Sequence, residues 1–393
     1  INQTLTVTQM AKLTASDGAA GDRFGSGAIS GNYAIIAAQR DDDNGSASGS
    51  AYFYARQADG SWIQTSKITA SDGVAYDSFG SSVAISGGNA VVGAYTDDAS
   101  GSAYIYTLQT NGNWIETRKL LAADGGTNDA FGWSVAISGD YVLVGAHGNN
   151  LNRGAAYLYS QQENGSWVQT TKLTASDGIG GDSFGQSVSI SGSHAIVGAA
   201  LDGDKGDYSG SSYIYTRQID GSWAQTSKLL ASDGAAYDFF GLGVAISGNY
   251  AVVGSYRDDD KGSNSGSAYI FTHQSGGNWI QTKITANDGE IDDNFGAKVA
   301  ISGDNAIVGA YLDDDNGSES GSAYIYSRQT DGSWVQTDKL IASDGDIGDW
   351  FGGIVGISGD YAIVAANSDD NNSGIDSGAS YVFSLNLNTP LDS

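Results

Sequence analysis

Runs of acidic residues recur along the chain, and each precedes a glycine-rich turn. In one of them Asp313 and Asp315 flank Asp314, and Asn316-Gly317 follows. Alternate residues on an extended backbone point the same way, so the two outer carboxylates of a run converge on one point. Carboxylate and carbonyl oxygens are the ligands that Ca²⁺ prefers. The runs therefore predict calcium sites formed by Asp41, Asp43, Asp202, Asp204, Asp258, Asp260, Asp313, Asp315, Asp369 and Asn371.

The outer positions of these runs recur more regularly than the middle one. Asp202-Gly203-Asp204 has glycine in the middle, so we expect the middle carboxylate to be dispensable. The chain has seven repeats, delimited below, and the third has no acid in its corresponding stretch, 147–150. We expect calcium in repeats one, four, five and six, more weakly in seven, and not in three. The spacing is not that of an EF-hand loop, and a solvated acidic turn is the alternative that the sequence leaves open.

A second set of carboxylates precedes every Phe-Gly pair. In the stretch Ala-Ser-Asp-Gly-x-x-x-Asp-x-Phe-Gly the two acids are five residues apart, as in Asp72 and Asp77. Uniform recurrence favours an architectural role, in which the side-chain oxygens cap backbone N–H groups of the turn and of the Phe-Gly pair. Contact with a ligand is the alternative.

Tryptophans fall into two groups. Six occupy equivalent positions after a turn, where they pack against an adjoining strand or stack on sugar rings: Trp62, Trp114, Trp167, Trp223, Trp279 and Trp334. Trp133 and Trp350 break the repeat, and both lie beside a Phe-Gly pair. Because they are not part of the repeated pattern, we predict that these two contact a ligand.

The residues that common catalytic mechanisms need are not grouped. His147, His194 and His273 fall at three different positions of three repeats, which does not suggest a Ser-His-Asp triad. The acids are too numerous and too repetitive to single out a glycosidase pair. The chain has no cysteine, which excludes thiol nucleophiles and thiolate metal sites. We therefore expect a protein that is not an enzyme.

The repeated spacing of one motif predicts the fold that positions these residues. Phe-Gly pairs recur at intervals of 52 to 56 residues, beginning at Phe24, Phe79, Phe131, Phe184, Phe240, Phe295 and Phe351. Each repeat contains four short strand-like stretches separated by glycine, asparagine and aspartate turns, and no segment has helical periodicity. Repeated four-stranded antiparallel units are typical of a β-propeller. We predict an all-β, seven-bladed propeller that forms a single domain over residues 1–393.

The chain ends predict how the ring closes. The seventh repeat stops after its third strand, Ser380-Tyr381-Val382-Phe383, and lacks the Gly-Ser-Trp segment that begins a fourth. Residues 4–13 resemble a fourth strand when Lys12 and Asp17 are aligned with Lys67 and Asp72. We expect residues 4–13 to complete the last blade, which leaves no unpaired edge, and residues 385–393 to form a tail.

The sequence resembles the FG-GAP repeat family, the propeller of integrin α chains and of many bacterial surface proteins. The family's motif has two halves, Phe-Gly and Gly-Ala-Pro. The Phe-Gly half matches in all seven repeats, and the second half is present as Gly-Ala, without the proline, at Gly93, Gly145, Gly198 and Gly309. The resemblance implies an extracellular, non-catalytic, ligand-binding propeller. Integrin-like units carry a calcium loop between the two halves of the motif. This chain has only a tight turn there, as in 302–305, so that calcium site is not carried over.

The net charge of the chain disfavours some classes of binding partner. The formal net charge of -27 at pH 7 disfavours nucleic acid and anionic membranes, and no apolar run is long enough to span a bilayer. We expect a secreted or cell-surface propeller that binds a protein or glycan through a face of acidic loops, with calcium as its cofactor. A multivalent lectin with equivalent pockets between blades and a structural subunit of an extracellular layer or filament are the alternatives. The sequence does not indicate an oligomeric state.

Overall fold

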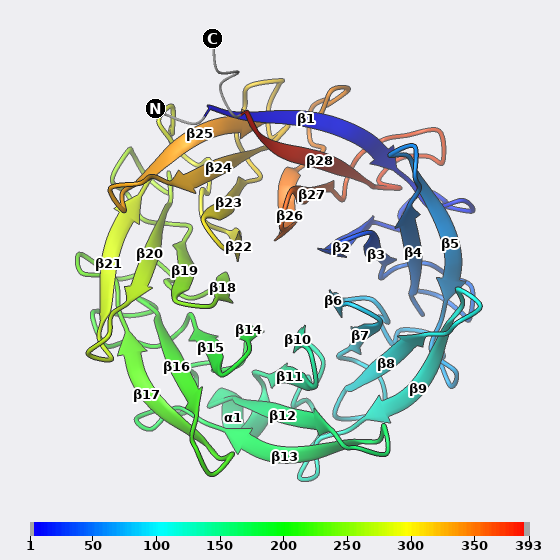
Figure 1. The fold of residues 1–393 in the computed structure, drawn as a ribbon, viewed down its shortest axis with the longest axis horizontal. Helices are drawn as coiled ribbons and strands as arrows, with labels where there is room; N and C mark the ends of the chain where they lie inside the picture. Colours follow the sequence, from blue (N-terminus) through cyan, green and yellow to red (C-terminus); the bar gives the residue numbers. More distant parts are fainter. Residues whose placement is uncertain (1–3, 389–393) are drawn as a thin grey trace.

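The structure is a computed structural model, and it describes residues 4–388. Its strands form seven four-stranded antiparallel sheets. The sheets are arranged as blades around a central channel, and each has its first strand at the channel (Figure 1). The predicted all-β, seven-bladed propeller is confirmed.

The first four blades follow the chain order, with one complete blade to each repeat. Blade 1 contains β2 (Phe24–Ser30), β3 (Tyr33–Ala38), β4 (Ser50–Arg56) and β5 (Trp62–Ile68). Blade 2 contains β6 (Ser82–Ser86), β7 (Asn89–Ala94), β8 (Ser102–Leu108) and β9 (Trp114–Leu120). Blade 3 contains β10 (Ser134–Ser138), β11 (Tyr141–Ala146), β12 (Ala155–Gln161) and β13 (Trp167–Leu173). Blade 4 contains β14 (Ser187–Ser191), β15 (His194–Ala199), β16 (Ser211–Arg217) and β17 (Trp223–Leu229).

The remaining blades complete the ring. Blade 5 contains β18 (Val244–Ser247), β19 (Tyr250–Ser255), β20 (Ser267–His273) and β21 (Trp279–Ile284). Blade 6 contains β22 (Lys298–Ser302), β23 (Asn305–Ala310), β24 (Ser322–Arg328) and β25 (Trp334–Leu340). Blade 7 contains β26 (Phe351–Ser358), β27 (Tyr361–Ala366), β28 (Ala379–Asn388) and β1 (Thr4–Leu13). The one helical element among the described residues is the short turn α1 (Asn149–Asn152) in blade 3.

The N-terminal strand closes the ring as predicted. β1 pairs antiparallel with β28, so the first described residues supply the outermost strand of the last blade (Figure 1). The expected tail requires a correction, because residues 385–388 belong to β28 and pair with β1. Residues 389–393 lie outside the described part of the chain.

The Phe-Gly pair locks each blade to the next. The Phe79 ring is fully buried, with its centroid 5.5 Å from that of Tyr104 and 6.1 Å from that of Tyr106. The glycine of the pair is required for two reasons: its φ is positive, and a neighbouring backbone leaves no room for a Cβ atom. At Gly132, φ is +95° and a Cβ atom would lie 2.1 Å from the carbonyl oxygen of Ser102. Any side chain there would push the crossover away from the neighbouring sheet.

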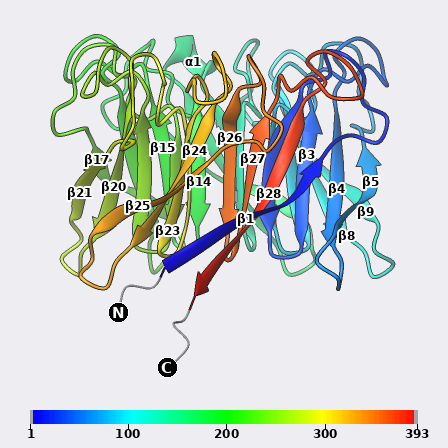
Figure 2. The same ribbon diagram turned by 90° about the horizontal axis from the view of Figure 1, so that it is seen from above.

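Loops alternate between the two ends of the ring, as a four-stranded meander requires. The acidic runs and the crossovers between blades share one end, which we call the acidic-loop face, and the tight hairpins occupy the other (Figure 2). The two kinds of loop are joined by backbone hydrogen bonds. The Tyr76 amide donates to the Ser46 carbonyl at 2.8 Å, and the Phe79 amide donates to the Ser48 carbonyl at 3.0 Å. The acids of both loops therefore lie side by side.

Candidate functional site

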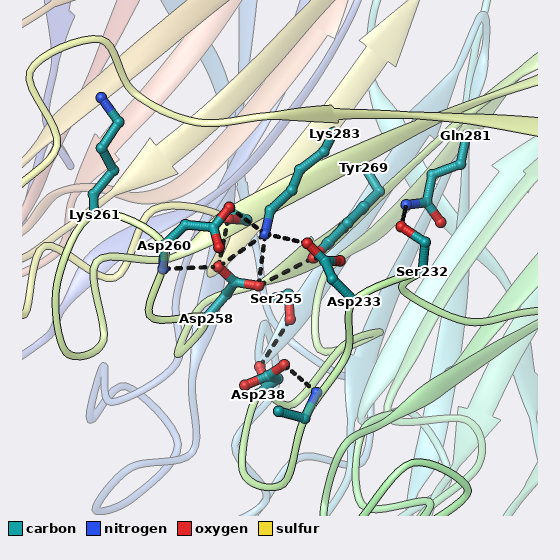
Figure 3. A network of polar contacts seen from close by, with 12 residues as sticks. Ser232, Asp233, Asp238, Ser255, Asp258, Asp260, Lys261, Tyr269, Gln281 and Lys283 are labelled. Carbon is teal, nitrogen blue, oxygen red and sulfur yellow. Dashed lines mark hydrogen bonds and ion pairs between the residues drawn. The ribbon is translucent and has the colours of Figure 1, made fainter.

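A lysine ammonium lies where the acidic loops converge, as blade 5 shows (Figure 3). The Nζ atom of Lys283, on the outer strand β21, is 2.8 Å from Asp233, 3.0 Å from Asp258 and 2.5 Å from Asp260. The hydroxyl of Tyr269 lies 2.9 Å from Asp233 Oδ1 and 3.0 Å from Asp258 Oδ2. One crossover acid and the two outer acids of the run thus surround a single cation. We call this arrangement the lysine clamp.

Related clamps occur in six of the seven blades. Each uses the lysine near the end of the outer strand, and these lysines are Lys12, Lys67, Lys119, Lys228, Lys283 and Lys339. In blade 7, Lys12 is 2.8 Å from both Asp344 and Asp369. Asn371 does not join this clamp, because its side-chain amide donates to the carbonyl of Gly378 and its Oδ1 accepts from the Ser373 amide.

The clamp shifts the titration of its members. Burial lowers the pKa of Lys283, but hydrogen bonds to Asp233, Asp260 and Asp258 outweigh it and raise the pKa of this ammonium overall. Partial burial raises the pKa of Asp233, but the hydrogen bonds from Lys283 and Tyr269, with the charge of Lys283, together outweigh it and bring this pKa below its usual value. The two shifts have the same meaning, because each partner stabilises the charged form of the other.

The predicted calcium ligands of four blades therefore converge, but around an ammonium group, and in blade 7 only Asp369 of the predicted pair does so. The outer carboxylates of repeats one, four, five and six converge, and so does Asp369 of repeat seven. The arrangement does not fit a calcium ion beside the ammonium, because the same carboxylate oxygens already contact Nζ at hydrogen-bonding distance. Calcium would have to displace the lysine, and its binding stays a prediction. The middle acid has a separate role: Asp259 accepts from the Asn264 amide at 2.8 Å and closes the loop.

The crossover acids divide into two roles, which corrects half of the sequence expectation. The second acid of each pair caps the turn: Asp77 Oδ2 accepts from the Val74 amide at 2.6 Å, and Asp293 Oδ2 accepts from the Glu290 amide at 2.6 Å. The first acid, such as Asp72, pairs with lysine and tyrosine instead. The Phe-Gly amides bond to backbone carbonyls, not to these carboxylates.

Blade 3 departs from the pattern. Asn149 replaces the first acid of the run, so Lys172 keeps only Asp124, at 2.6 Å, as an ion-pair partner. The missing carboxylate leaves a cavity of about 460 Å³, lined in part by Asp124, Asn149 and Lys172. That this repeat binds no calcium stays a prediction.

The six repeated tryptophans pack between blades. Trp114 of β9 stacks on Phe53 of the preceding blade with a centroid distance of 4.1 Å, and Trp62 of β5 meets Tyr361 at 6.2 Å. Five of the six are buried and Trp279 is half-buried. Their rings are therefore used as packing surfaces and are poorly placed to stack on sugars.

The two tryptophans predicted to contact a ligand each immediately precede the innermost strand of a blade, Trp133 before β10 and Trp350 before β26. Trp133 is 37% exposed and makes edge contacts with Tyr95 and His147. Trp350 is half-buried, meets Tyr311 edge-on at 6.3 Å, and donates its indole N–H to Glu319 at 3.1 Å. Ligand contact by either residue stays a prediction.

Trp350 forms part of a pocket that sequence reasoning missed. This cavity of about 280 Å³ lies where the first strands of blades 5, 6 and 7 begin, and we call it the channel-mouth pocket. Its principal lining side chains are Leu242, Tyr256, Lys298, Tyr311, Trp350 and Asn367. One signal was available in the sequence: Lys298 occupies a position that is serine in the second, third and fourth repeats.

The clamp lysines also had a visible signal. Seven of the chain's lysines occupy the same place in the repeat, one residue before a leucine or isoleucine: Lys12, Lys67, Lys119, Lys172, Lys228, Lys283 and Lys339. An outer strand ordinarily directs such residues to water, so the sequence does not connect the lysines with the acidic runs. The contact is visible only once the outer strand and both loops are placed together.

Fold and sequence comparisons define the class of this protein. It is a seven-bladed β-propeller. The FG-GAP repeat family matches the chain in seven segments, over residues 7–54, 62–106, 114–159, 167–215, 223–271, 279–326 and 334–383. The chain therefore belongs to the FG-GAP repeat family. No match was found among the curated proteins compared.

A solved structure corrects one expectation. The structure of the Pseudomonas aeruginosa periplasmic gluconolactonase is similar to this chain, with a TM-score of 0.50 and 14% identity, covering 80% of this chain and 84% of the other. At this identity the likeness concerns the fold alone. It overturns the inference that this chain is not an enzyme, because an enzyme has the same type of propeller. Among the described residues, no helix is long and apolar enough to cross a membrane.

Proposed function

We propose that this protein is an extracellular carbohydrate-binding propeller whose ligand occupies the channel-mouth pocket. The observation that carries the proposal is the combination of aromatic walls and free hydrogen-bonding groups in one concave site. Tyr256, Tyr311 and Trp350 are half-buried, so each keeps part of its ring accessible. Rings of this kind provide the flat apolar surfaces on which the C–H faces of sugars pack.

Polar groups in the pocket favour a hydroxylated ligand. Among the described residues, the side chains of Tyr256, Lys298, Tyr311 and Asn367 have no hydrogen-bond or ion-pair partner. Groups that stay unpaired in a concave site are available to a ligand and give it orientation. A sugar offers several hydroxyls at the spacing of such donors and acceptors. One pocket per propeller follows, because no other blade has a lysine at the position of Lys298 or a tryptophan at the position of Trp350.

Location outside the cell and calcium dependence belong to the same proposal. The absence of cysteine and the net charge of -27 suit a salty exterior, where self-repulsion is screened. Each complete clamp contains three carboxylates and one ammonium, so its net charge is about -2. We propose that calcium binds by displacing the clamp lysine from these carboxylates, and that its binding strengthens the acidic-loop face.

A glycan array tests the proposal with three proteins. Trp350→Ala removes one wall of the pocket. Tyr76→Ala removes an aromatic that is 68% exposed on the same face but belongs to another crossover. We expect the parent and Tyr76→Ala to bind the same glycans and Trp350→Ala to lose them. If the parent bound no glycan, or if both variants behaved like the parent, the proposal would fail.

Because an enzyme shares this architecture, the fate of the bound sugar is part of the test. Glycans that bind on the array are incubated with the protein, and the products are separated by mass. Intact sugar after prolonged incubation supports binding alone. New fragments, or a mass increase of one water, would show that the pocket also performs hydrolysis.

A further inference from the structure

We propose that the channel-mouth pocket selects a sugar bearing a carboxylate, that is, a uronic acid unit of an acidic glycan. This inference rests on the proposed function and adds the charge of the ligand to it. Its basis is Lys298, the first residue of β22, which lines the pocket together with Trp350 and Tyr311.

Lys298 differs from every other lysine of the described chain. Seven lysines contact carboxylates in or beside the clamps, and Lys205 and Lys261 donate to the backbone carbonyls of Ser232 and Asn287. Of the lysines in the described part of the chain, Lys298 alone has no hydrogen-bond or ion-pair partner. In a protein with 45 acidic and 18 basic residues, an unpaired ammonium is unexpected unless a ligand supplies the anion.

The fold does not require a lysine at this position. In blades 2 and 3 the equivalent residues are Ser82 and Ser134, whose hydroxyls donate to the carbonyls of Gly132 and Gly185 in the next blade. Lys298 replaces this bridge between blades with a longer, charged side chain that is exposed in the pocket. The substitution therefore gives up a structural contact and places a basic side chain at the channel mouth. Burial lowers the pKa of this side chain, and a bound carboxylate would stabilise its charged form.

The surroundings of Lys298 favour an anion. Of the described residues that line the pocket, none carries a carboxylate. The guanidinium of Arg257 lies 5.3 Å from the ring centroid of the lining residue Tyr256, so a second cation is near the pocket without lining it. Glu319, the acid that Trp350 contacts, accepts the indole N–H. The net charge of the molecule repels anions, but at physiological ionic strength this field is screened over about 8 Å.

Aromatic walls and a cation together specify more than an anion. A sulfate or phosphate ion would use Lys298 but would leave the rings of Tyr256, Tyr311 and Trp350 without a contact. A neutral sugar would use the rings and leave the ammonium unpaired. A uronic acid uses both, because its carboxylate extends from a ring whose C–H face packs on an aromatic surface. The free amide of Asn367 is then available to a hydroxyl of the same ring.

The experiment compares ligands that differ only in charge. Oligogalacturonates and oligoglucuronates are titrated as free acids and as methyl esters, by calorimetry, against the parent, Lys298→Met and Lys261→Met. Lys261 is an exposed lysine one blade away, so its variant makes the same change of charge outside the pocket. A charged hydrogen bond contributes enough to binding that we expect the acid to bind about tenfold or more tightly than its ester. Lys298→Met should reduce this ratio to near one, and Lys261→Met should keep it.

The outcomes separate this inference from the proposed function. If acid and ester bind equally and Lys298→Met has no effect, while Trp350→Ala weakens both, the pocket binds sugars but does not select charge. If no uronic acid binds and the array finds only neutral glycans, the inference is likewise overturned. If Trp350→Ala changes the binding of no glycan, the proposed function itself fails. A melting temperature of Lys298→Met equal to that of the parent excludes misfolding as the cause.

Discussion

Replacing Lys283 with methionine tests whether the lysine clamp stabilises the propeller. The variant keeps most of the side-chain length but leaves Asp233, Asp258 and Asp260 without their shared cation. Asp258 is 4% exposed, and removing the partner of a buried charge costs about 3 to 5 kcal/mol. Asp233 and Asp260 are about half exposed, so their pairs add roughly 0 to 1 kcal/mol each.

The lower end of the range applies to Asp258. This carboxylate still accepts hydrogen bonds from the Ser267 hydroxyl at 2.9 Å and the Tyr269 hydroxyl at 3.0 Å, which compensate part of the lost ion pair. We therefore expect a loss of about 3 kcal/mol in the free energy of unfolding. For a domain of this size that corresponds to a melting temperature about 4 °C lower.

The assay is differential scanning calorimetry of the parent, Lys283→Met and Lys261→Met in EDTA. Lys261→Met is the matched control, because Lys261 is in the same blade and contacts only a backbone carbonyl, at 3.4 Å. Calcium is then added, since the three freed carboxylates have oxygens within 4.8 Å of one another and form a cage for a divalent cation. We expect calcium to restore the melting temperature of Lys283→Met. Equal melting of the two variants in EDTA would refute the clamp.

Three further predictions concern pH, ring closure and calcium. Burial, reinforced by Asp313, raises the pKa of Asp293 to about 6, so this acid destabilises the fold above that pH and the penalty disappears below its unfolded value near 3.8. Asp293→Asn should raise the melting temperature more at pH 7.5 than at pH 4.5, and an equal effect at both would contradict the assignment. Deleting residues 1–13 removes β1 and exposes β28, so aggregation or a large drop in melting temperature is expected, whereas parent-like melting would disprove closure by this strand. Calcium should stabilise the parent more than magnesium does, and replacing Asp313 and Asp315 by asparagine should remove one site while Asp314→Asn leaves it; no response to EDTA would argue against calcium sites.

The fold could be predicted because the information is repeated and local. Seven Phe-Gly pairs and the turns between them indicate the number of blades, and the missing fourth strand after Phe383 indicates how the ring closes. Convergence of Asp258 and Asp260 could also be predicted, since alternate residues of one extended segment share a direction. These inferences depend only on neighbours in the chain.

The lysine clamp could not be predicted in the same way. Lys283 is 25 residues from Asp258 and 50 from Asp233, so the contact depends on how an outer strand and two loops are placed. A cluster of acids without a visible counter-ion resembles a metal site, and the ammonium that pairs with it is on an outer strand, where side chains ordinarily face water. The channel-mouth pocket is still harder to predict from the sequence, because its lining residues come from three blades and lie between Leu242 and Asn367.

The position of a bound acidic oligosaccharide is the most direct test of the proposed function. A crystal structure of the protein grown with an oligogalacturonate or oligoglucuronate locates the ligand without a variant. The proposal predicts a sugar ring against Trp350 and Tyr311 at the channel mouth, with its carboxylate within hydrogen-bonding distance of Lys298 Nζ. A sugar bound between the outer strands, or on the hairpin face with an empty channel mouth, would contradict it.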